Sequence, residues 1–259
     1  MPATVTIESV DFLVLDERGV VDHVLGAAAE GRGLHVLTVN VDILRRLRKS
    51  AEFRDYVGDY VAIADGMPIV WASALQGERL PARVSGSDLI GSLTVAATGA
   101  GRRVLLLGGV GGAAEAACVA LVDRGADRAS LFSHELPNPM PFERAYLDEL
   151  AALVQREAPD VVFVSLGSPK GERLISELRG HAPAASWLSV GAAFDFLAGR
   201  VDRAPRAVRD SGLEWFHRLS REPGRLGKRY LVDDAPFVVA MLARAAGRGI
   251  GSALGRKPA

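Results

Sequence analysis

The chain has 259 residues, of which 49% are hydrophobic, and its 31 basic residues balance 31 acidic ones. This composition predicts a folded globular chain and argues against disorder and against non-specific binding of nucleic acid. The single cysteine, Cys118, excludes an intramolecular disulfide framework and fits a reducing compartment, so we expect a cytoplasmic location. No apolar run approaches the roughly 18 residues of a membrane span, and the N-terminus lacks a signal-peptide pattern.

Short apolar runs rich in Val, Leu and Ile are predicted to be buried strands. They are Val10–Leu15, Leu34–Val39, Tyr60–Ala64, Arg103–Leu107, Asp160–Ser165 and Ser186–Val190. Segments with helical spacing lie between them, namely Val20–Glu30, Val41–Lys49, Ser87–Ala97, Ala113–Arg124, Phe142–Glu157 and Glu172–Arg179. The alternation predicts an α/β fold, a Rossmann-like open sheet with mainly parallel strands flanked by helices. Ligands of such sheets bind beyond the carboxyl ends of the strands.

The alternation stops near residue 199, where the charge balance also changes. Residues 200–259 contain 13 basic and 6 acidic residues, which leaves 18 basic and 25 acidic residues for 1–199. We therefore predict an α/β domain over 1–199 and a basic, helical appendage over 200–259.

Polar residues end two of the predicted strands. Asp65 follows one of them directly and precedes the flexible Gly66, so its carboxylate could act as a general base toward a hydroxyl. Thr38 and Asn40 arrive at the same edge and could orient that base or hold a substrate. The structural alternative is that Asp65 and Asn40 each cap the helix that follows, and the pattern alone leaves both interpretations open.

Two glycine-containing turns follow other predicted strands. Gly108 and Gly109 begin a glycine-rich turn before a helix, where backbone amides could approach a diphosphate. A plain tight turn is equally consistent, because the spacing matches neither a dinucleotide fingerprint nor a phosphate-binding loop with its lysine.

The second of these turns carries charged residues. It runs from Gly167 through Pro169 to Lys170 and Glu172, so Lys170 could contact a phosphate and Glu172 a sugar hydroxyl. The alternative is a turn followed by a solvated helix start.

Aromatic and basic residues are interleaved in the predicted appendage. Residues 200–229 carry nine basic and four acidic side chains among Trp, Phe and Leu, and Tyr230 follows. The pattern favours either a surface that docks on a membrane or a set of arginines that bind a diphosphate. A solvated helix pair packed on the domain would explain it equally well. Phe194 and Phe196 are interpreted as core residues, and Asp195 between them as a buried or capping acid without a catalytic role. The five histidines lack metal-ligand spacing, so no metal site is expected.

Several short motifs, taken together and in order, resemble those of the WecG/TagA/CpsF glycosyltransferase family. They are T-x-N at 38–40, A-D-G-x-P-x-V-W at 64–71, R-V-x-G-x-D-L at 83–89, G-x-P-K-x-E at 167–172, F-D-F-L-A-G at 194–199, R-A-P at 203–205 and G-L-E-W-x-x-R-L-x-x-E-P at 212–223. The resemblance implies an inverting, metal-independent enzyme without a cofactor. It implies a UDP-sugar donor, commonly UDP-N-acetylmannosamine or its uronic acid, and a polyprenyl-diphosphate-linked acceptor at the inner membrane surface.

The resemblance also assigns roles to residues. Asp65 is implied as the base, with Thr38 and Asn40 beside it. Substrate binding is implied for Gly66, Arg83, Asp88, Gly108, Gly109, Gly167, Pro169, Lys170, Glu172, Arg218, Arg221 and Arg225. The chain departs from the family at Gly171, where relatives usually carry glutamine.

The sequence is also compatible with two other functions. The turn at Gly108 would suit a nucleotide-dependent oxidoreductase, and Gly171 would suit a non-catalytic scaffold that binds nucleotide-sugars at a membrane. The resemblance also leaves self-association through the apolar face of the appendage open.

Overall fold

A computed structural model of the chain describes residues 2–202, 214–221 and 227–255, with residues 204, 205, 208 and 224 between them. The strands are β1 Thr4–Ile7, β2 Val10–Leu13, β3 His35–Val39, β4 Val61–Ala64, β5 Val104–Gly108, β6 Leu131–His134, β7 Val161–Ser165 and β8 Ser186–Ser189. The α-helices are α1 Glu17–Ala29, α2 Val41–Lys49, α3 Ala51–Val57, α4 Met67–Leu75, α5 Gly86–Gly99, α6 Ala113–Val122, α7 Arg144–Glu157, α8 Lys170–Leu178, α9 Ala193–Leu197, α11 Glu214–Arg221 and α13 Ala235–Gly255. Short helical turns are η1 Arg128–Ser130, η2 Arg179–His181 and the π-helical η3 Lys228–Asp234.

The described strands form one open sheet in the order β1-β2-β4-β3-β8-β7-β5-β6. Every pair is parallel except β1 with β2, which form an antiparallel pair at one edge. The predicted α/β fold with a mainly parallel open sheet is therefore confirmed, and all six predicted strands are present. The chain leaves β3 and β8, adjacent strands at the centre, toward opposite faces, and such a switch point is where ligands of these sheets bind.

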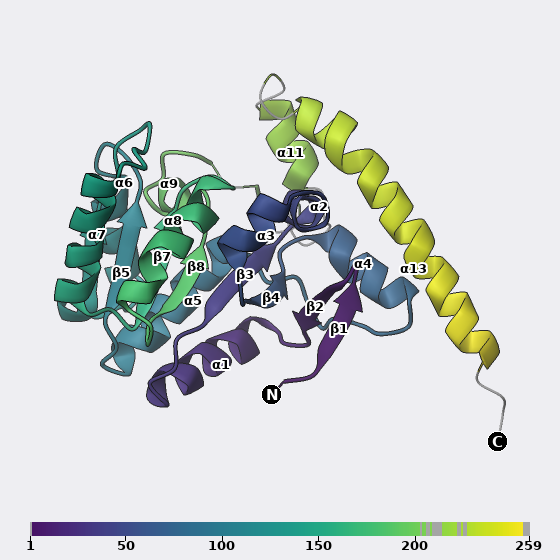
Figure 1. The fold of residues 1–259 in the computed structure, drawn as a ribbon, viewed down its shortest axis with the longest axis horizontal. Coiled ribbons are helices and arrows are strands. Elements are labelled where there is room, and N and C mark those ends of the chain that lie inside the picture. The colour runs from purple at the N-terminus through teal and green to yellow at the C-terminus, as the bar shows by residue number, and fades with distance from the viewer. Residues whose placement is uncertain are drawn as a thin grey trace.

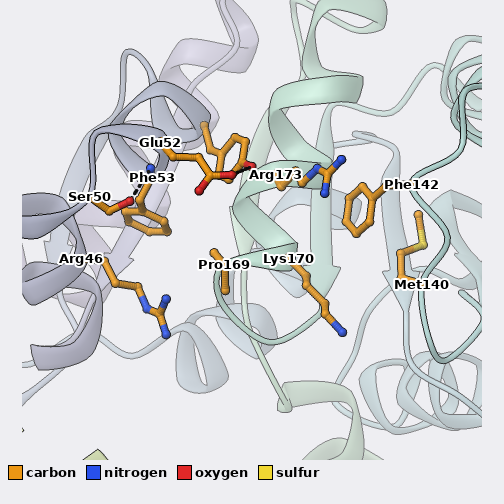
Figure 2. A pocket seen from close by; sticks show the side chains of 10 residues that line it. Arg46, Ser50, Glu52, Phe53, Met140, Phe142, Pro169, Lys170 and Arg173 are labelled. Atoms are coloured by element: carbon orange, nitrogen blue, oxygen red, sulfur yellow. Dashed lines mark hydrogen bonds between the residues drawn. The ribbon is translucent and has the colours of Figure 1, made fainter. Parts of the chain in front are cut away.

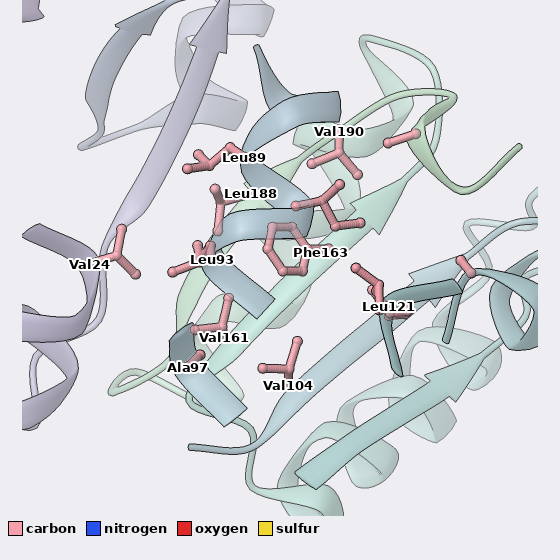
Figure 3. Close-up of a cluster of buried hydrophobic side chains, with 14 of the residues drawn as sticks. Val24, Leu89, Leu93, Ala97, Val104, Leu121, Val161, Phe163, Leu188 and Val190 are labelled. Atoms are coloured by element: carbon pink, nitrogen blue, oxygen red, sulfur yellow. The ribbon is translucent and has the colours of Figure 1, made fainter. Parts of the chain in front are cut away.

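Helices cover both faces of the sheet (Figure 1). Alternate residues of each central strand point to opposite faces, so Val161 and Phe163 of β7 enter one core while Val162 and Val164 enter another. The first core packs β-strand side chains against α1, α5, α6 and α9, and Figure 3 shows Phe163 at its centre. Burial on both faces explains why these strands are continuous apolar runs.

Capping side chains begin several helices next to the carboxyl edge of the sheet. The amide of Ile43 donates to Asn40 Oδ1 (3.0 Å), and the amide of Asp88 donates to Ser85 Oγ (3.2 Å). Each cap satisfies an amide that the first turn would leave without a partner. The predicted capping role of Asn40 is therefore present, and the caps fix where α2 and α5 leave the sheet.

The C-terminal helix α13 packs against α4 beside the β1 edge (Figure 1). Met241 and Ala245 of α13 are fully buried in the same core as α2 and α4. Arg244 Nε donates to the buried carboxylate of Glu8 at 2.9 Å. Helix α13 thus shares a hydrophobic core with the α/β sheet domain. The predicted domain boundary at residue 200 stays a prediction. In the described part of the chain, no helix has the length and apolar character needed to cross a membrane.

Candidate functional site

A cleft of about 930 Å³ lies over the carboxyl edge of the sheet. Its walls come from the segments after β3, β4, β7 and β8, from the turn before α5, and from η3 and the start of α13. Ten of the fifteen residues predicted for the site line it: Thr38, Asn40, Asp65, Gly66, Arg83, Gly109, Gly167, Pro169, Lys170 and Glu172. The parallel topology brings these residues together because it places the ends of all these strands at one edge.

Asp65 lies at the end of β4 and faces a cation. Its Oδ1 is 3.6 Å from an Arg83 guanidinium nitrogen, and the same guanidinium lies 3.4 Å from Asp88 Oδ2. Ser85 Oγ donates to Asp88 Oδ2 at 2.6 Å, which holds Asp88 in the first turn of α5. The Asp65 side chain is 24% exposed, so this carboxylate is both positioned and open to the cleft.

Thr38 and Asn40 lie on the neighbouring strand end. The Thr38 hydroxyl donates to the backbone oxygen of Ser189 at 3.1 Å and is buried. Asn40 combines its capping role with a place in the cleft wall. Thr38 therefore ties β3 to β8 beneath the cleft, directly beside the Asp65 strand.

The glycine-rich turn after β5 contributes less surface than its sequence predicts. Gly109 lines the cleft, but its amide points to the Ser165 carbonyl at 3.5 Å. Gly108 lies beneath the surface with φ at 126°, and a Cβ there would approach the Ser165 oxygen to 2.6 Å. Arg200 donates to the carbonyls of Val110 and Gly111. Glycine is thus required at position 108 by close strand packing.

Glu172 in the first turn of α8 is a fully buried carboxyl beneath the cleft. Burial raises the pKa of this carboxyl, and the hydroxyls of Ser168 and Ser189 and the charge of Arg46 offset part of the rise. Among the described residues, neither Glu172 oxygen has a partner at hydrogen-bond geometry, and the same holds for Ser168 Oγ. Buried polar atoms of this kind are normally satisfied, and the Ser168 and Ser189 hydroxyls are the neighbouring groups that can donate to Glu172.

Gly171 departs from the family pattern for a steric reason. A Cβ at this position would lie 2.5 Å from Ser189 Oγ and 3.2 Å from the Leu166 carbonyl oxygen. Position 171 and Ser189 therefore compete for one volume, and glycine resolves the conflict.

Arg229 reaches the cleft from η3. Its guanidinium lies 3.5 Å from Asp234 and 3.8 Å from Asp42 at the start of α2, while Arg45 binds the same two carboxylates. This charge network attaches the C-terminal segment to the edge of the cleft. Arg221, in contrast, is outside the cleft lining and pairs with Asp202 at 2.9 Å. Arg225 and the side chain of Arg218 lie outside the described residues.

Some lining residues were not predicted as site residues. Arg229 looks like any other arginine of a basic segment, whereas Trp71 stands in the A-D-G-x-P-x-V-W motif and could have been found there. Ser189 ends β8, and no charged residue beside it marks the position in the sequence. Asp195 and Phe196 also line the cleft, so the prediction that Phe196 belongs to the core is wrong, while Phe194 is fully buried as expected. The short helix α9 turns these neighbouring side chains in different directions.

The described residues contain no group of three or more His, Cys, Asp or Glu side chains arranged to hold a metal ion. The charged groups that the cleft offers to an anion are Arg83, Lys170 and Arg229. Asp65 and Asp195 are the carboxylates nearest the ends of β4 and β8. The arrangement can hold an anionic ligand while presenting a carboxylate to a reacting hydroxyl.

Comparison with known proteins identifies the family. Residues 5–250 match the family model described as "Glycosyl transferase WecG/TagA/CpsF family". A relative from Bacillus subtilis (strain 168), named N-acetylglucosaminyldiphosphoundecaprenol N-acetyl-beta-D-mannosaminyltransferase, is 30% identical over 222 residues, 83% of this chain and 78% of the relative. A Bacillus spizizenii protein of the same name is 28% identical over 221 residues, 82% and 80% of the two chains. The chain therefore belongs to the WecG/TagA/CpsF family of glycosyltransferases.

Proposed function

We propose that this enzyme moves an N-acetylmannosamine-type sugar from a UDP-sugar to a sugar linked to polyprenyl diphosphate, in the synthesis of a cell-surface polysaccharide. The observation that carries the proposal is the cleft in which the Asp65 carboxylate and three cationic side chains share one volume. The names of the Bacillus relatives supply the substrate class. Membership of a glycosyltransferase family argues against an oxidoreductase.

The chemistry proposed for the cleft is a single displacement. Asp65 takes the proton from the acceptor hydroxyl as that oxygen attacks the anomeric carbon, and the bond from this carbon to the UDP oxygen breaks. Lys170 and Arg229 stabilise the negative charge that develops on the departing diphosphate. Attack from the face opposite the leaving group inverts the anomeric configuration. Asn40 and Thr38 hold the strand ends that set the position of Asp65.

Glu172 and Ser168 extend the donor site in this proposal. Their buried oxygens would form hydrogen bonds with polar groups of the donor, such as hydroxyls of its ribose or sugar. Gly66, Gly167 and Pro169 shape the wall on which the donor lies, while Arg83 and Asp88 position Asp65. The residues after 200 would complete the site and place it at the inner surface of the membrane.

Transfer assays with Asp65→Asn test the assignment of the base. With UDP-N-acetylmannosamine and a short-chain polyprenyl-diphosphate N-acetylglucosamine, kcat should fall about 100- to 10,000-fold, because the amide cannot accept the proton. Product mass would be followed by mass spectrometry, and the anomeric configuration by NMR. Asp123→Asn, at the C-terminal end of α6 and outside the cleft lining, is the matched control. Near-normal turnover by folded Asp65→Asn would exclude Asp65, and retention of configuration would exclude a single displacement.

A further inference from the structure

A second pocket, of about 300 Å³, lies between α3 and the start of α8 (Figure 2). Met140, Pro169 and Lys170 line both this pocket and the cleft, so the two are neighbours across the turn that precedes α8. The displacement reaction proposed above uses Lys170 from this lining, and it uses none of the residues that line the second pocket alone.

Positive charge exceeds negative charge in this pocket. Its lining contains the cations Arg46, Lys170 and Arg173 and a single acid, Glu52. Arg46 pairs with Asp42 at 3.0 Å, and within the described part of the chain neither Lys170 nor Arg173 has an ion pair. Glu52 accepts a hydrogen bond from the Tyr56 hydroxyl, which occupies one of its oxygens.

The remaining walls of the pocket orient these groups. The Arg173 guanidinium lies 4.1 Å from the centre of the Phe142 ring, a contact that leaves its N–H edges open to an acceptor. Ser50 Oγ accepts from the Phe53 amide at 3.1 Å and retains its own proton for donation. The lining thus offers a guanidinium, an ammonium and a hydroxyl, and groups of these kinds bind the acceptor oxygens of a phosphate.

We propose that this pocket is a binding site for a phosphate or diphosphate group, with Arg173 and Lys170 as its main ligands and Arg46 in support. Two sources can supply that group. One is the diphosphate of the acceptor, which reaches the pocket past Lys170, and this source rests on the proposed function. The other is free inorganic pyrophosphate, which needs only the pocket itself.

Calorimetric titration of the full chain with pyrophosphate, in the presence of saturating UDP, tests the site. Arg173→Gln removes the charge and should weaken pyrophosphate binding about tenfold, the usual loss for one charged hydrogen bond. Arg18→Gln on α1 is the matched control, because the Arg18 side chain is 90% exposed and no residue of α1 lines the pocket. Thermal unfolding of both variants verifies that they are folded.

Equal pyrophosphate affinity in the two variants would overturn the proposal, as would full competition between pyrophosphate and UDP in the wild type. A KM for the lipid acceptor that rises only in Arg173→Gln identifies the acceptor diphosphate as the source. An unchanged KM with weakened pyrophosphate binding identifies a free anion. If the wild type fails to bind UDP, the proposed function fails. The comparison of pyrophosphate affinity in Arg173→Gln and Arg18→Gln still tests whether the pocket binds phosphate.

Discussion

Position 171 shows how one side chain limits its neighbour at the site. Gly171→Ala would place a methyl group 2.5 Å from Ser189 Oγ, and we expect it to lower the free energy of unfolding by about 1–3 kcal/mol. The double variant Gly171→Ala, Ser189→Gly removes the conflict and should recover most of that loss, while the Ser189 carbonyl that accepts from Thr38 remains. Urea denaturation measures all three proteins.

The matched control for position 171 is Gly26→Ala in α1, where a Cβ would meet nothing within 4 Å. There the same methyl group should be neutral or should stabilise by about 0.5–1 kcal/mol, because alanine is the better helix former. A loss at Gly171 that the double variant does not relieve would show that Ser189 is not the cause.

Individual site residues were predictable where polar groups follow apolar strands directly. Asp65 and Asn40 satisfy this condition, and the parallel topology then determines that they meet. Arg229 could not be chosen from the sequence, because its position depends on how a C-terminal segment folds back over α2 and pairs with Asp42. Asp195 was not predicted as a site residue, because the two phenylalanines that flank it indicated a core segment.

Strand β3 carries a buried histidine that makes stability depend on pH. His35 Nδ1 donates to the Val57 carbonyl at 2.9 Å and joins β3 to the end of α3. Burial lowers the pKa of His35 from 6.5 to about 4, and the charge of Arg179 adds to this effect. Between these two values the unfolded chain binds a proton that the folded chain does not, so the free energy of unfolding falls as pH falls from 6.5 toward 4.

His35→Asn keeps a donor near Val57 and removes the titration. We expect the wild type to lose about 3 kcal/mol more stability than this variant between pH 7 and pH 4, and the two slopes to agree above about pH 7.5. Urea denaturation at stepped pH gives both curves, and His181→Asn provides a matched change at an exposed position. Parallel curves for wild type and His35→Asn would contradict the prediction.

Strands buried on both faces were predictable as apolar runs, whereas the edge strands were not. Strand β1 alternates exposed and buried residues over four positions, and only Leu131 of β6 is fully buried. An edge strand is short and has water on one side, so it gives neither a long apolar run nor a convincing alternation. The same reasoning explains why β3, β5 and β7, with five buried residues each, were found.

The whole molecule leaves several large apolar side chains exposed along its C-terminal segment. Phe216 of α11 is 60% exposed and Val232 of η3 is 63% exposed. Each of them directly follows a residue that lines the cleft. The proposed acceptor is held in a membrane by its polyprenyl chain, so these side chains are suited to enter the bilayer interface beside the cleft. Deleting the entire segment would be a poor test, because Met241 and Ala245 belong to the core.

Paired point variants test membrane docking without damage to the core. Phe216→Ser with Val232→Ser removes apolar surface worth about 2 kcal/mol or more when buried, so binding to anionic vesicles should weaken at least tenfold in a sedimentation assay. Val119→Ser on α6 is the matched control, since Val119 is 53% exposed at the other end of the sheet. Transfer to a water-soluble acceptor should be retained in the double variant, because neither side chain lines the cleft. Unchanged vesicle binding would mean that another surface docks, and the exposed apolar residues of α11 and η3 would then need a protein partner.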